Sequence, residues 1–255
     1  MGSDSAFPEN VNGLLLDLSG VLYEDDSVLP GAAETVAAAR DRGLVLRFVT
    51  NTATKPATAI LDRLDRLGIR AQPDELFTAP RAARAWLEAE NRRPFCLIHE
   101  ALRGEFADLD QSEPDAVLLG DARDDLSYAN LNEAFRLCQA GAPLIGIGMN
   151  RYFKGSDGLM LDAGPFIRAV AWAADTEPVI MGKPGKAFFD QVVASTGLQP
   201  DACLMVGDDR EGDVIGAHDA GLQACLVRTG KFQAGDEADL PGGVGVIDGI
   251  GSLFT

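Results

Sequence analysis

The sequence predicts an α/β fold built on a doubly wound parallel sheet. Short apolar runs such as Leu14–Leu16 and Cys203–Val206 alternate with longer helical stretches, and several runs stop abruptly at a polar residue. A short continuous apolar run is typical of a strand that is buried on both faces, and its alternation with helices is typical of a parallel sheet. The chain of 255 residues, 46% of them hydrophobic, is long enough to bury a sizeable core.

The first part of the predicted core spans residues 1–78. Its expected elements are, in order, a strand ending at Asp17, a helix at 30–42, a strand at 44–49 and a helix at 55–67. Pro30 and Pro56 suit the first turns of the two helices, and Gly43 and Gly68 suit their ends. The acidic stretch after Tyr23 is expected to form a flap that leaves the end of the first strand.

A second α/β segment is expected at residues 79–178. Helices are expected at 81–90, 101–107, 128–140 and 165–174, with strands at 94–98, 116–119 and 143–147 and an irregular loop at 148–164. This is enough regular structure for a small domain inserted into the core. The core is then expected to resume at 179–255, with an apolar run at 179–181, a helix at 185–195, strands at 203–206 and 223–227, and a short helix at 212–220 between them. The tail from Thr229 is expected to be loop or cover.

The charge balance excludes some classes of partner. The chain has 22 Lys and Arg against 39 Asp and Glu, a formal net charge of −17. This excess of negative charge argues against nucleic acid and against an anionic membrane surface as partners. An anionic substrate stays compatible, provided that a metal, a lysine or a helix N-terminus makes the site locally positive.

The cysteines predict a reducing compartment. Cys96, Cys138, Cys203 and Cys225 lie in apolar segments without metal-ligand spacing, so buried free thiols are expected, as is usual in the cytoplasm. The sequence has no run of about 18 apolar residues, and its polar, acidic start does not resemble a signal sequence. We therefore expect a cytoplasmic protein.

Polar residues follow three of the predicted core strands. They are Asp17 and Ser19, then Thr50 and Asn51, then Asp208 and Asp209, with Asp213 one turn further on. A fourth apolar run precedes Lys183. Because the carboxyl ends of strands in one parallel sheet form a common ligand-binding edge, these side chains are expected to converge.

These residue types indicate metal-assisted phosphoryl chemistry. Several carboxylates at close range require a counter-cation, and oxygen-only ligands select a hard ion such as Mg²⁺. An Asp beside that ion can attack phosphorus to form an aspartyl phosphate, which water hydrolyses. The Thr50 hydroxyl, Asn51 and the Lys183 ammonium would hold the phosphoryl oxygens. Each residue alone also fits a turn, a helix cap or an exposed loop, so the prediction depends on their joint placement. His99 and His218 have no such companions and are assigned structural roles.

The polar segments together resemble the four motifs of the haloacid dehalogenase-like phosphatase superfamily. The motifs are DLSGVLY at 17–23, TN at 50–51, GKP at 182–184 and GDDREGD at 207–213. The long insert resembles the cap of that superfamily's second cap class. The resemblance covers nearly the whole chain and is strongest to the branch of phospholysine phosphohistidine inorganic pyrophosphate phosphatase and its haloacid dehalogenase-like domain-containing relatives. Segments 97–99, 127–132, 151–154 and 158–162 also look like that branch.

The resemblance implies a Rossmann-like core at 1–78 and 179–255, with an inserted α/β cap at 79–178. It implies that Asp17 is the nucleophile, and that Lys183 binds phosphate together with Thr50 and Asn51. Mg²⁺ would be held by the Asp17 carboxylate, the Ser19 backbone carbonyl and Asp208, and supported by Asp209 and Asp213. It also implies a small phosphorylated substrate and a homodimer formed through the cap.

Ser19 departs from the usual superfamily pattern, which has a second Asp there as general acid and base; the closest branch is similar to this chain in having Ser. A hydroxyl is a poor proton donor or acceptor at neutral pH, and a positioned acid–base group is worth about 10²–10⁴-fold in rate. The loss affects an alkoxide leaving group most, and imidazole or phosphate least. Ser19 therefore predicts a preference for N–P and P–O–P bonds over alkyl phosphomonoesters. Asp209 is the candidate base for the second half-reaction.

Two other functions stay open from the sequence. A metal-independent dehalogenase would also lack the second Asp, although Asp208, Asp209 and Asp213 favour a metal. A non-catalytic phospho-ligand-binding protein would fit the loss of an acid–base residue, although retention of Asp17 and Lys183 favours turnover. Substrate choice is expected to lie in a cap that closes over the site, where the candidate contacts are Arg151, Tyr152, Lys154 and Arg168.

Overall fold

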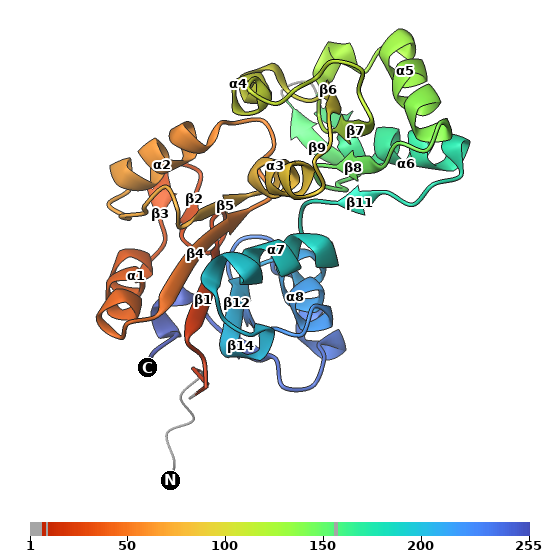
Figure 1. Ribbon diagram of the computed structural model, residues 1–255. Helices are drawn as coiled ribbons and strands as arrows, with labels where there is room; N and C mark the ends of the chain where they lie inside the picture. Colours follow the sequence, from red (N-terminus) through yellow and green to blue (C-terminus); the bar gives the residue numbers. More distant parts are fainter. Residues whose placement is uncertain (1–6, 9, 156–157) are drawn as a thin grey trace. The chain divides into compact units, whose positions relative to one another are not determined.

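The computed structural model in Figure 1 describes residues 7–8, 10–155 and 158–255. Its contacts divide the chain into two units. The first comprises the described residues up to Thr50 together with Ala57–Phe77 and Phe189–Thr255, and the second comprises Asn51–Pro56 and Thr78–Phe188. Each unit contains its own parallel sheet.

The first unit is built on a six-stranded sheet. Its strands are β1 (Gly13–Asp17), β4 (Val45–Thr50), β5 (Leu76–Thr78), β12 (Cys203–Gly207), β13 (Gln223–Val227) and β14 (Gly245–Ile247). They lie in the order β14-β13-β12-β1-β4-β5. Strand β1 pairs in parallel with β12 and β4, and β13 pairs in parallel with β12 and β14. The predicted parallel α/β fold is confirmed.

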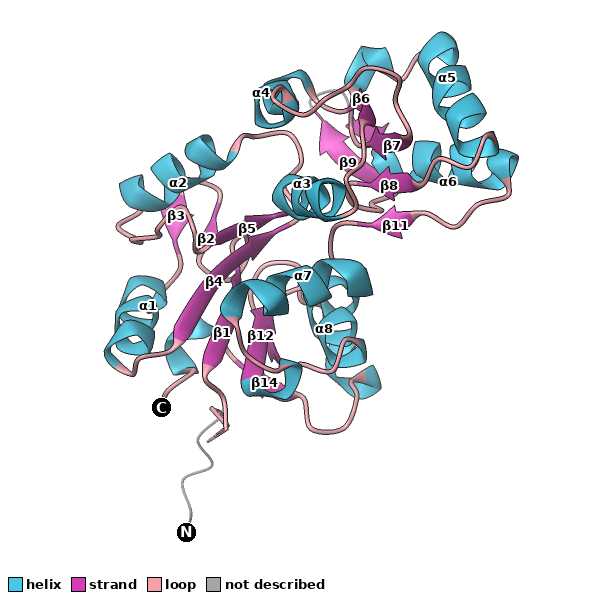
Figure 2. Cartoon of the chain, viewed as in Figure 1, coloured by secondary structure: helices cyan, strands magenta, loops and turns pink. Residues whose placement is uncertain are grey.

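Strand β1 is buried along its whole length because both faces of the sheet are covered. Leu14 and Leu16 belong to a core cluster that includes Val36 of a covering helix, whereas Leu15, equally buried, alternates to the opposite face. The helices of this layer arrangement are α1 (Ala32–Asp41), α2 (Ala57–Arg66), α7 (Lys186–Thr196) and α8 (Gly216–Asp219). Figure 2 shows α1 on one side of the strands and α8 on the other. A small hairpin, β2 (Tyr23–Glu24) with β3 (Ser27–Val28), forms the predicted flap.

The second unit has a four-stranded sheet in the order β11-β8-β7-β6. Its strands are β6 (Pro94–Leu97), β7 (Ala116–Leu119), β8 (Leu144–Gly146) and β11 (Val179–Ile180). The helices are α3 (Ala79–Ala89), α4 (Arg103–Phe106), α5 (Tyr128–Gln139) and α6 (Ala163–Ala174). A core cluster that includes Leu97, Val117 and Leu144 joins the sheet to α5 through Ala134 and to α6 through Ile167.

Three sequence expectations differ from the structure. The run before Lys183 was expected in the same sheet as Asp17, but β11 pairs with β8, Val179 opposite Ile145. The stretch expected as an irregular loop contains the antiparallel hairpin β9 (Tyr152–Gly155) and β10 (Gly158–Leu161). The tail contributes β14 to the first sheet. In each case the local pattern was too short or too mixed to reveal a partner that is distant in sequence.

The sequence assigns residues 51–56 and 179–188 to the core, whereas their contacts group them with the second unit. The inserted domain at 79–178 stays a prediction. Among the described residues, every helix is too short or too polar to cross a bilayer.

Candidate active site

Polar residues occupy the carboxyl ends of neighbouring strands in the first unit. Asp17 is the last residue of β1 and Thr50 is the last residue of β4, while Asp208 directly follows β12. The parallel register aligns these ends, with Asp17 opposite Val49 and Leu16 opposite Val206. The apolar runs that precede them are buried, so the sheet fixes where each polar side chain begins.

Three carboxylates meet at this edge. Asp17, Asp208 and Asp213 each offer an oxygen atom, and these atoms lie within 4.8 Å of one another. The three side chains are buried, with exposed fractions of 7%, 2% and 1%. Ionised carboxylates repel at such separations unless a cation lies among them, and an all-oxygen donor set suits a hard divalent ion such as Mg²⁺. The chemistry of the donor set therefore fits the predicted metal.

Asp213 is held in the group by its own local structure. It lies in a turn of π-helix, Arg210–Ile215, and its Oδ2 accepts a hydrogen bond of 3.1 Å from the backbone N–H of Asp209. Gly207 permits this approach, since a Cβ there would lie 2.1 Å from the Cβ of Asp213.

Asp209 faces different partners. Its Oδ1 caps the same turn by accepting from the Gly212 N–H at 2.8 Å, and its Oδ2 contacts the Lys231 ammonium at 2.9 Å. Within the described residues, the group of three carboxylates does not include Asp209. The supporting role expected for Asp209 stays a prediction.

The segment Thr229–Lys231, which was expected to be part of the tail, follows β13 and adjoins this cluster. The backbone N–H of Lys231 donates a hydrogen bond of 2.7 Å to Asp208 Oδ2, Gly230 contacts the same carboxylate, and the Thr229 hydroxyl donates to the carbonyl of Gly20. Burial lowers the pKa of Lys231, but the hydrogen bond and charge of Asp209 outweigh it, and the pKa is raised overall. The sequence did contain a usable pattern, because Thr-Gly-Lys follows an apolar strand just as the other polar motifs do.

Ser19 lies in the turn beyond β1. Its side chain is exposed, and its backbone forms a single bridge with Tyr23. Gly20, with φ of +82°, makes the turn possible. Tyr23 is buried beneath the Arg63 guanidinium, which lies 4.4 Å from the ring centroid. Burial raises the pKa of Tyr23, Arg63 opposes the rise and the charge of Asp17 adds to it.

The second unit contains the other predicted phosphate-binding residues, Asn51 and Lys183. The Asn51 side chain donates from Nδ2 to the Lys183 carbonyl at 2.9 Å and accepts at Oδ1 from the Lys183 N–H at 2.7 Å. Lys183 is buried, with 7% of its surface exposed. Gly182 lies against Asn51, whose Oδ1 would be 3.2 Å from a Cβ on that glycine.

The candidate substrate contacts of the predicted cap are surface residues. Arg151, Tyr152 and Arg168 are exposed, and the side chain of Lys154 lies outside the described part of the structure. Phe153 lies on the same hairpin as Tyr152. The Arg123 guanidinium lies over its ring, 4.5 Å from the ring centroid. Arg123 in turn pairs with the buried carboxylate of Asp121 at 3.1 Å.

Within the described residues, no histidine or cysteine joins the group of three carboxylates. His99 Nδ1 accepts from the Ala101 N–H at the start of a 3₁₀ turn, and His218 is exposed beside Asp219. The four cysteines are free thiols; Cys138, Cys203 and Cys225 are buried and Cys96 is half-buried. Burial raises the pKa of Cys138 to about 11 and the pKa of Cys225 to about 12.

Comparison with known families agrees with this geometry. The model of the haloacid dehalogenase-like hydrolases matches residues 14–112, and a second model of HAD-like hydrolases matches residues 180–253. Haloacid dehalogenase-like hydrolase domain-containing protein 2 from Homo sapiens is 42% identical over 227 residues, which cover 89% of this chain and 88% of that protein. Phospholysine phosphohistidine inorganic pyrophosphate phosphatase from Homo sapiens is 39% identical over 233 residues, covering 89% and 86%.

Solved structures give the same result. A 4-nitrophenylphosphatase from Thermotoga maritima superposes with a TM-score of 0.83 at 27% identity, covering 96% of both chains. A glycerol phosphate phosphatase from Mycobacterium tuberculosis, solved in complex with magnesium, superposes with a TM-score of 0.82 at 26% identity, covering 98% of this chain and 78% of that one. The chain therefore belongs to the haloacid dehalogenase-like hydrolase family, as a phosphatase.

Proposed function

We propose that this phosphatase is a Mg²⁺-dependent phosphohydrolase that acts through an aspartyl-phosphate intermediate on small phosphorylated compounds, with a preference for P–O–P and N–P bonds. The observation that supports it best is the group of three buried carboxylates, Asp17, Asp208 and Asp213, whose oxygen atoms lie within 4.8 Å at the carboxyl edge of the sheet. Carboxylates are rarely buried unless they are paired or bind a cation.

Asp17, Asp208 and the Ser19 backbone carbonyl would hold the metal, and Asp213 and Asp209 would support them. The ion, when bound, supplies Lewis-acid polarisation of a phosphoryl oxygen and balances negative charge. The chain's own contribution is to keep the ligand atoms in place: Asp213 is fixed by the Asp209 N–H, and Asp208 by the Lys231 N–H.

Asp17 would act as the nucleophile. One of its carboxylate oxygens forms a bond to phosphorus while the bond from phosphorus to the leaving group breaks, and the leaving group departs with that electron pair. Water then attacks the phosphorus of the aspartyl phosphate, loses a proton, and releases inorganic phosphate with regeneration of the Asp17 carboxylate. Asp209 is the proposed acceptor of that proton.

Lys183, Asn51 and Thr50 would bind the phosphoryl group. The Lys183 ammonium would balance the charge on the phosphoryl oxygens, and the Thr50 hydroxyl would donate a hydrogen bond to one of them. Both side chains are buried, which strengthens such interactions because less water competes. The Asn51 amide already holds the Lys183 backbone, so we assign it a positioning role beside phosphate binding.

Ser19 supports the substrate preference. An exposed hydroxyl cannot replace a carboxylic acid in protonating an alkoxide, whereas phosphate and imidazole leave with little help. One relative carries phospholysine, phosphohistidine and inorganic pyrophosphate in its name, and bonds of these kinds are the ones that Ser19 favours.

The test is a panel of pyrophosphate, phosphohistidine, phospholysine and an alkyl phosphate, each with Mg²⁺ and with excess chelator. We expect turnover of the first three to exceed that of the alkyl phosphate, and every activity to vanish with the chelator. The Asp17→Asn variant should fold but release no phosphate. Turnover by Asp17→Asn, or full activity in chelator, would overturn the proposed mechanism.

We also propose a cytoplasmic homodimer formed through residues 79–178. Large apolar side chains on the surface of the second unit support an interface there: Trp172 is 88% exposed and Leu159 is 72% exposed. Sedimentation of the wild type against Trp172→Ser tests the association, and a monomeric wild type would contradict it.

A further inference from the structure

The segment Thr229–Lys231 follows β13 and adjoins the carboxylate group, although it lies outside the four sequence motifs. Strand β13 pairs in parallel with β12, and Gly207 lies opposite Leu226. The residues that follow β13 therefore lie beside those that follow β12, the first of which is Asp208.

Gly230 and Gly20 enclose the Asp208 carboxylate. A Cβ on Gly230 would lie 2.0 Å from Asp208 Oδ2 and 2.6 Å from the Cα of Gly20. A Cβ on Gly20 would likewise lie 2.0 Å from Asp208 Oδ2. Atoms cannot approach so closely, so any side chain at either position must displace the carboxylate or the backbone.

Lys231 adds two polar contacts to this enclosure. Its backbone N–H donates to Asp208 Oδ2 at 2.7 Å, and its ammonium contacts Asp209 Oδ2 at 2.9 Å. A carboxylate with one oxygen held by an N–H group has its plane and its second oxygen fixed as well. The Thr229 hydroxyl ties the same segment to the carbonyl of Gly20, in the turn that contains Ser19.

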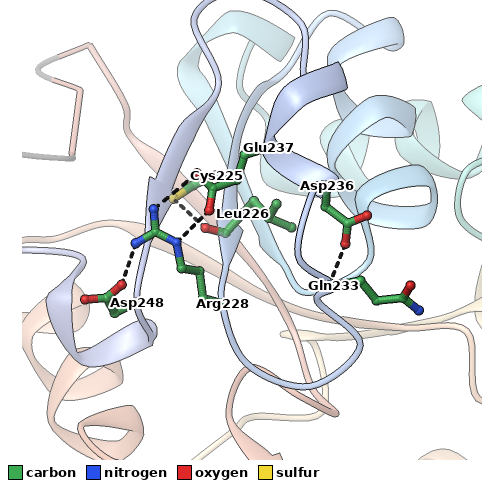
Figure 3. Close-up of polar contacts among 7 residues, drawn as sticks. All are labelled: Cys225, Leu226, Arg228, Gln233, Asp236, Glu237 and Asp248. Atoms are coloured by element: carbon green, nitrogen blue, oxygen red, sulfur yellow. Dashed lines mark hydrogen bonds and ion pairs between the residues drawn. The ribbon is translucent and has the colours of Figure 1, made fainter.

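The segment is anchored from behind by Arg228. Its Nε donates to Glu237 at 2.7 Å, and its Nη1 donates to Asp248 at 2.5 Å, as Figure 3 shows with the guanidinium between the two carboxylates. A guanidinium held by two carboxylates has few orientations available. The start of the segment is thus fixed to two stretches of the tail.

We propose that Thr229–Lys231 is a positioning element of the Mg²⁺ site, in which Gly230 and the Lys231 N–H set the orientation of the Asp208 carboxylate for the ion. The inference rests on the proposed function, because it assumes that Asp208 is a metal ligand. Partners of metal ligands typically contribute about 10–100-fold to metal affinity. None of the three residues is required to touch the substrate.

Gly230→Ala is the direct test, with Gly43→Ala as its matched control. Both glycines have a left-handed backbone, with φ of +60° and +73°, so both substitutions carry the same kind of strain. A Cβ on Gly43 meets nothing within 4 Å, whereas one on Gly230 meets Asp208. In titration calorimetry with Mg²⁺ alone, Gly230→Ala should raise the Kd by at least about tenfold. Gly43→Ala should leave the Kd unchanged while lowering the thermal midpoint.

Thr229→Val covers the case in which Gly230→Ala does not fold. It keeps the size of the side chain and removes only the hydroxyl bond to Gly20. The control is Thr35→Val, which removes another long-range bond, from the Thr35 hydroxyl to the Ile250 carbonyl at 3.1 Å. Loss of the bond to Gly20 frees the segment that orients Asp208, so Thr229→Val should raise the Kd for Mg²⁺, whereas Thr35→Val should leave it unchanged.

The outcomes separate the two proposals. If the wild type binds Mg²⁺ and both segment variants bind it equally well, the positioning element is wrong and the proposed function stands. If the wild type shows no Mg²⁺ binding and no chelator-sensitive turnover, the proposed function fails. Weaker binding in the segment variants alone supports the inference.

Discussion

Asn51 and Lys183 hold each other through two hydrogen bonds, although 132 residues separate them in the sequence. The Asn51 amide both donates to and accepts from the Lys183 backbone, so it fixes the peptide from which the lysine side chain extends. Asn51, which was expected to bind phosphate directly, thereby also supports Lys183, the other residue proposed to bind phosphate.

Asn51→Ala should lower kcat/KM by about 10–100-fold, since a small displacement of a charged group costs about that much when geometry matters. The thermal midpoint should fall only modestly. Asn130→Ala is the control: in the same unit it removes a single bond, from Asn130 Nδ2 to the Asp125 carbonyl at 2.8 Å, and should leave kcat/KM unchanged. Steady-state kinetics on pyrophosphate give the comparison. Wild-type kcat/KM in Asn51→Ala would remove Asn51 from the mechanism.

Ser19→Asp should change the substrate preference. A carboxylic acid at this exposed position would protonate an alkoxide leaving group, and a positioned acid–base group is worth about 10²–10⁴-fold. The ratio of alkyl phosphate turnover to pyrophosphate turnover should therefore rise by at least about tenfold. Ser19→Asn, similar in size and unable to donate a carboxyl proton, is the control. If the ratio of alkyl phosphate to pyrophosphate turnover is unchanged in Ser19→Asp, Ser19 does not explain the substrate preference.

Local patterns were sufficient for much of the fold and of the candidate site. Asp17, Thr50 and Asp208 each end or follow an apolar run, and buried parallel strands require such runs whatever their neighbours. The parallel order of the sheet then brings their ends together.

The rest depended on pairing between distant segments. Val179–Ile180 reads as a strand, but two residues do not determine which sheet accepts it, and the structure pairs it with β8. The hairpin β9–β10 was missed because β10 exposes Leu159, Met160 and Leu161, so no alternation of apolar and polar residues marks it. The contact of Lys231 with Asp208 was missed because Lys231 lies in the tail from Thr229, which is rich in Gly and Asp and resembles an ordinary loop.

Gly207→Ala should destabilise the first unit and weaken Mg²⁺ binding together. The new Cβ would lie 2.1 Å from the Asp213 Cβ and 2.3 Å from its Cγ, and overpacking of this kind costs about 1–3 kcal/mol or more. Gly245→Ala, also in a strand of the same sheet, is the control, because its Cβ meets only Cys225, with Sγ at 3.5 Å and Cβ at 3.8 Å. Urea unfolding and Mg²⁺ calorimetry on both variants test the prediction. Equal stability of the two would show that Asp213 can move aside freely.

Cys225 should make the protein less stable in alkali. The thiol is 1% exposed, and burial raises its pKa to about 12, above the value of about 8.5 for an unfolded chain. The folded state therefore holds the proton more tightly. The free energy of unfolding should be independent of this group below about pH 8.5 and should then fall as pH rises, by up to about 1.4 kcal/mol per pH unit.

Cys225→Ala removes the titrating group at the cost of some packing. Urea unfolding from pH 7 to 10.5 should show the variant less stable than the wild type at neutral pH, with the difference shrinking steadily above pH 8.5. Val227→Ala, in the same strand, loses packing but keeps the thiol, so its difference from the wild type should stay constant over that range. A constant difference for Cys225→Ala as well would mean that the thiolate is accommodated in the fold, and that burial does not govern the titration.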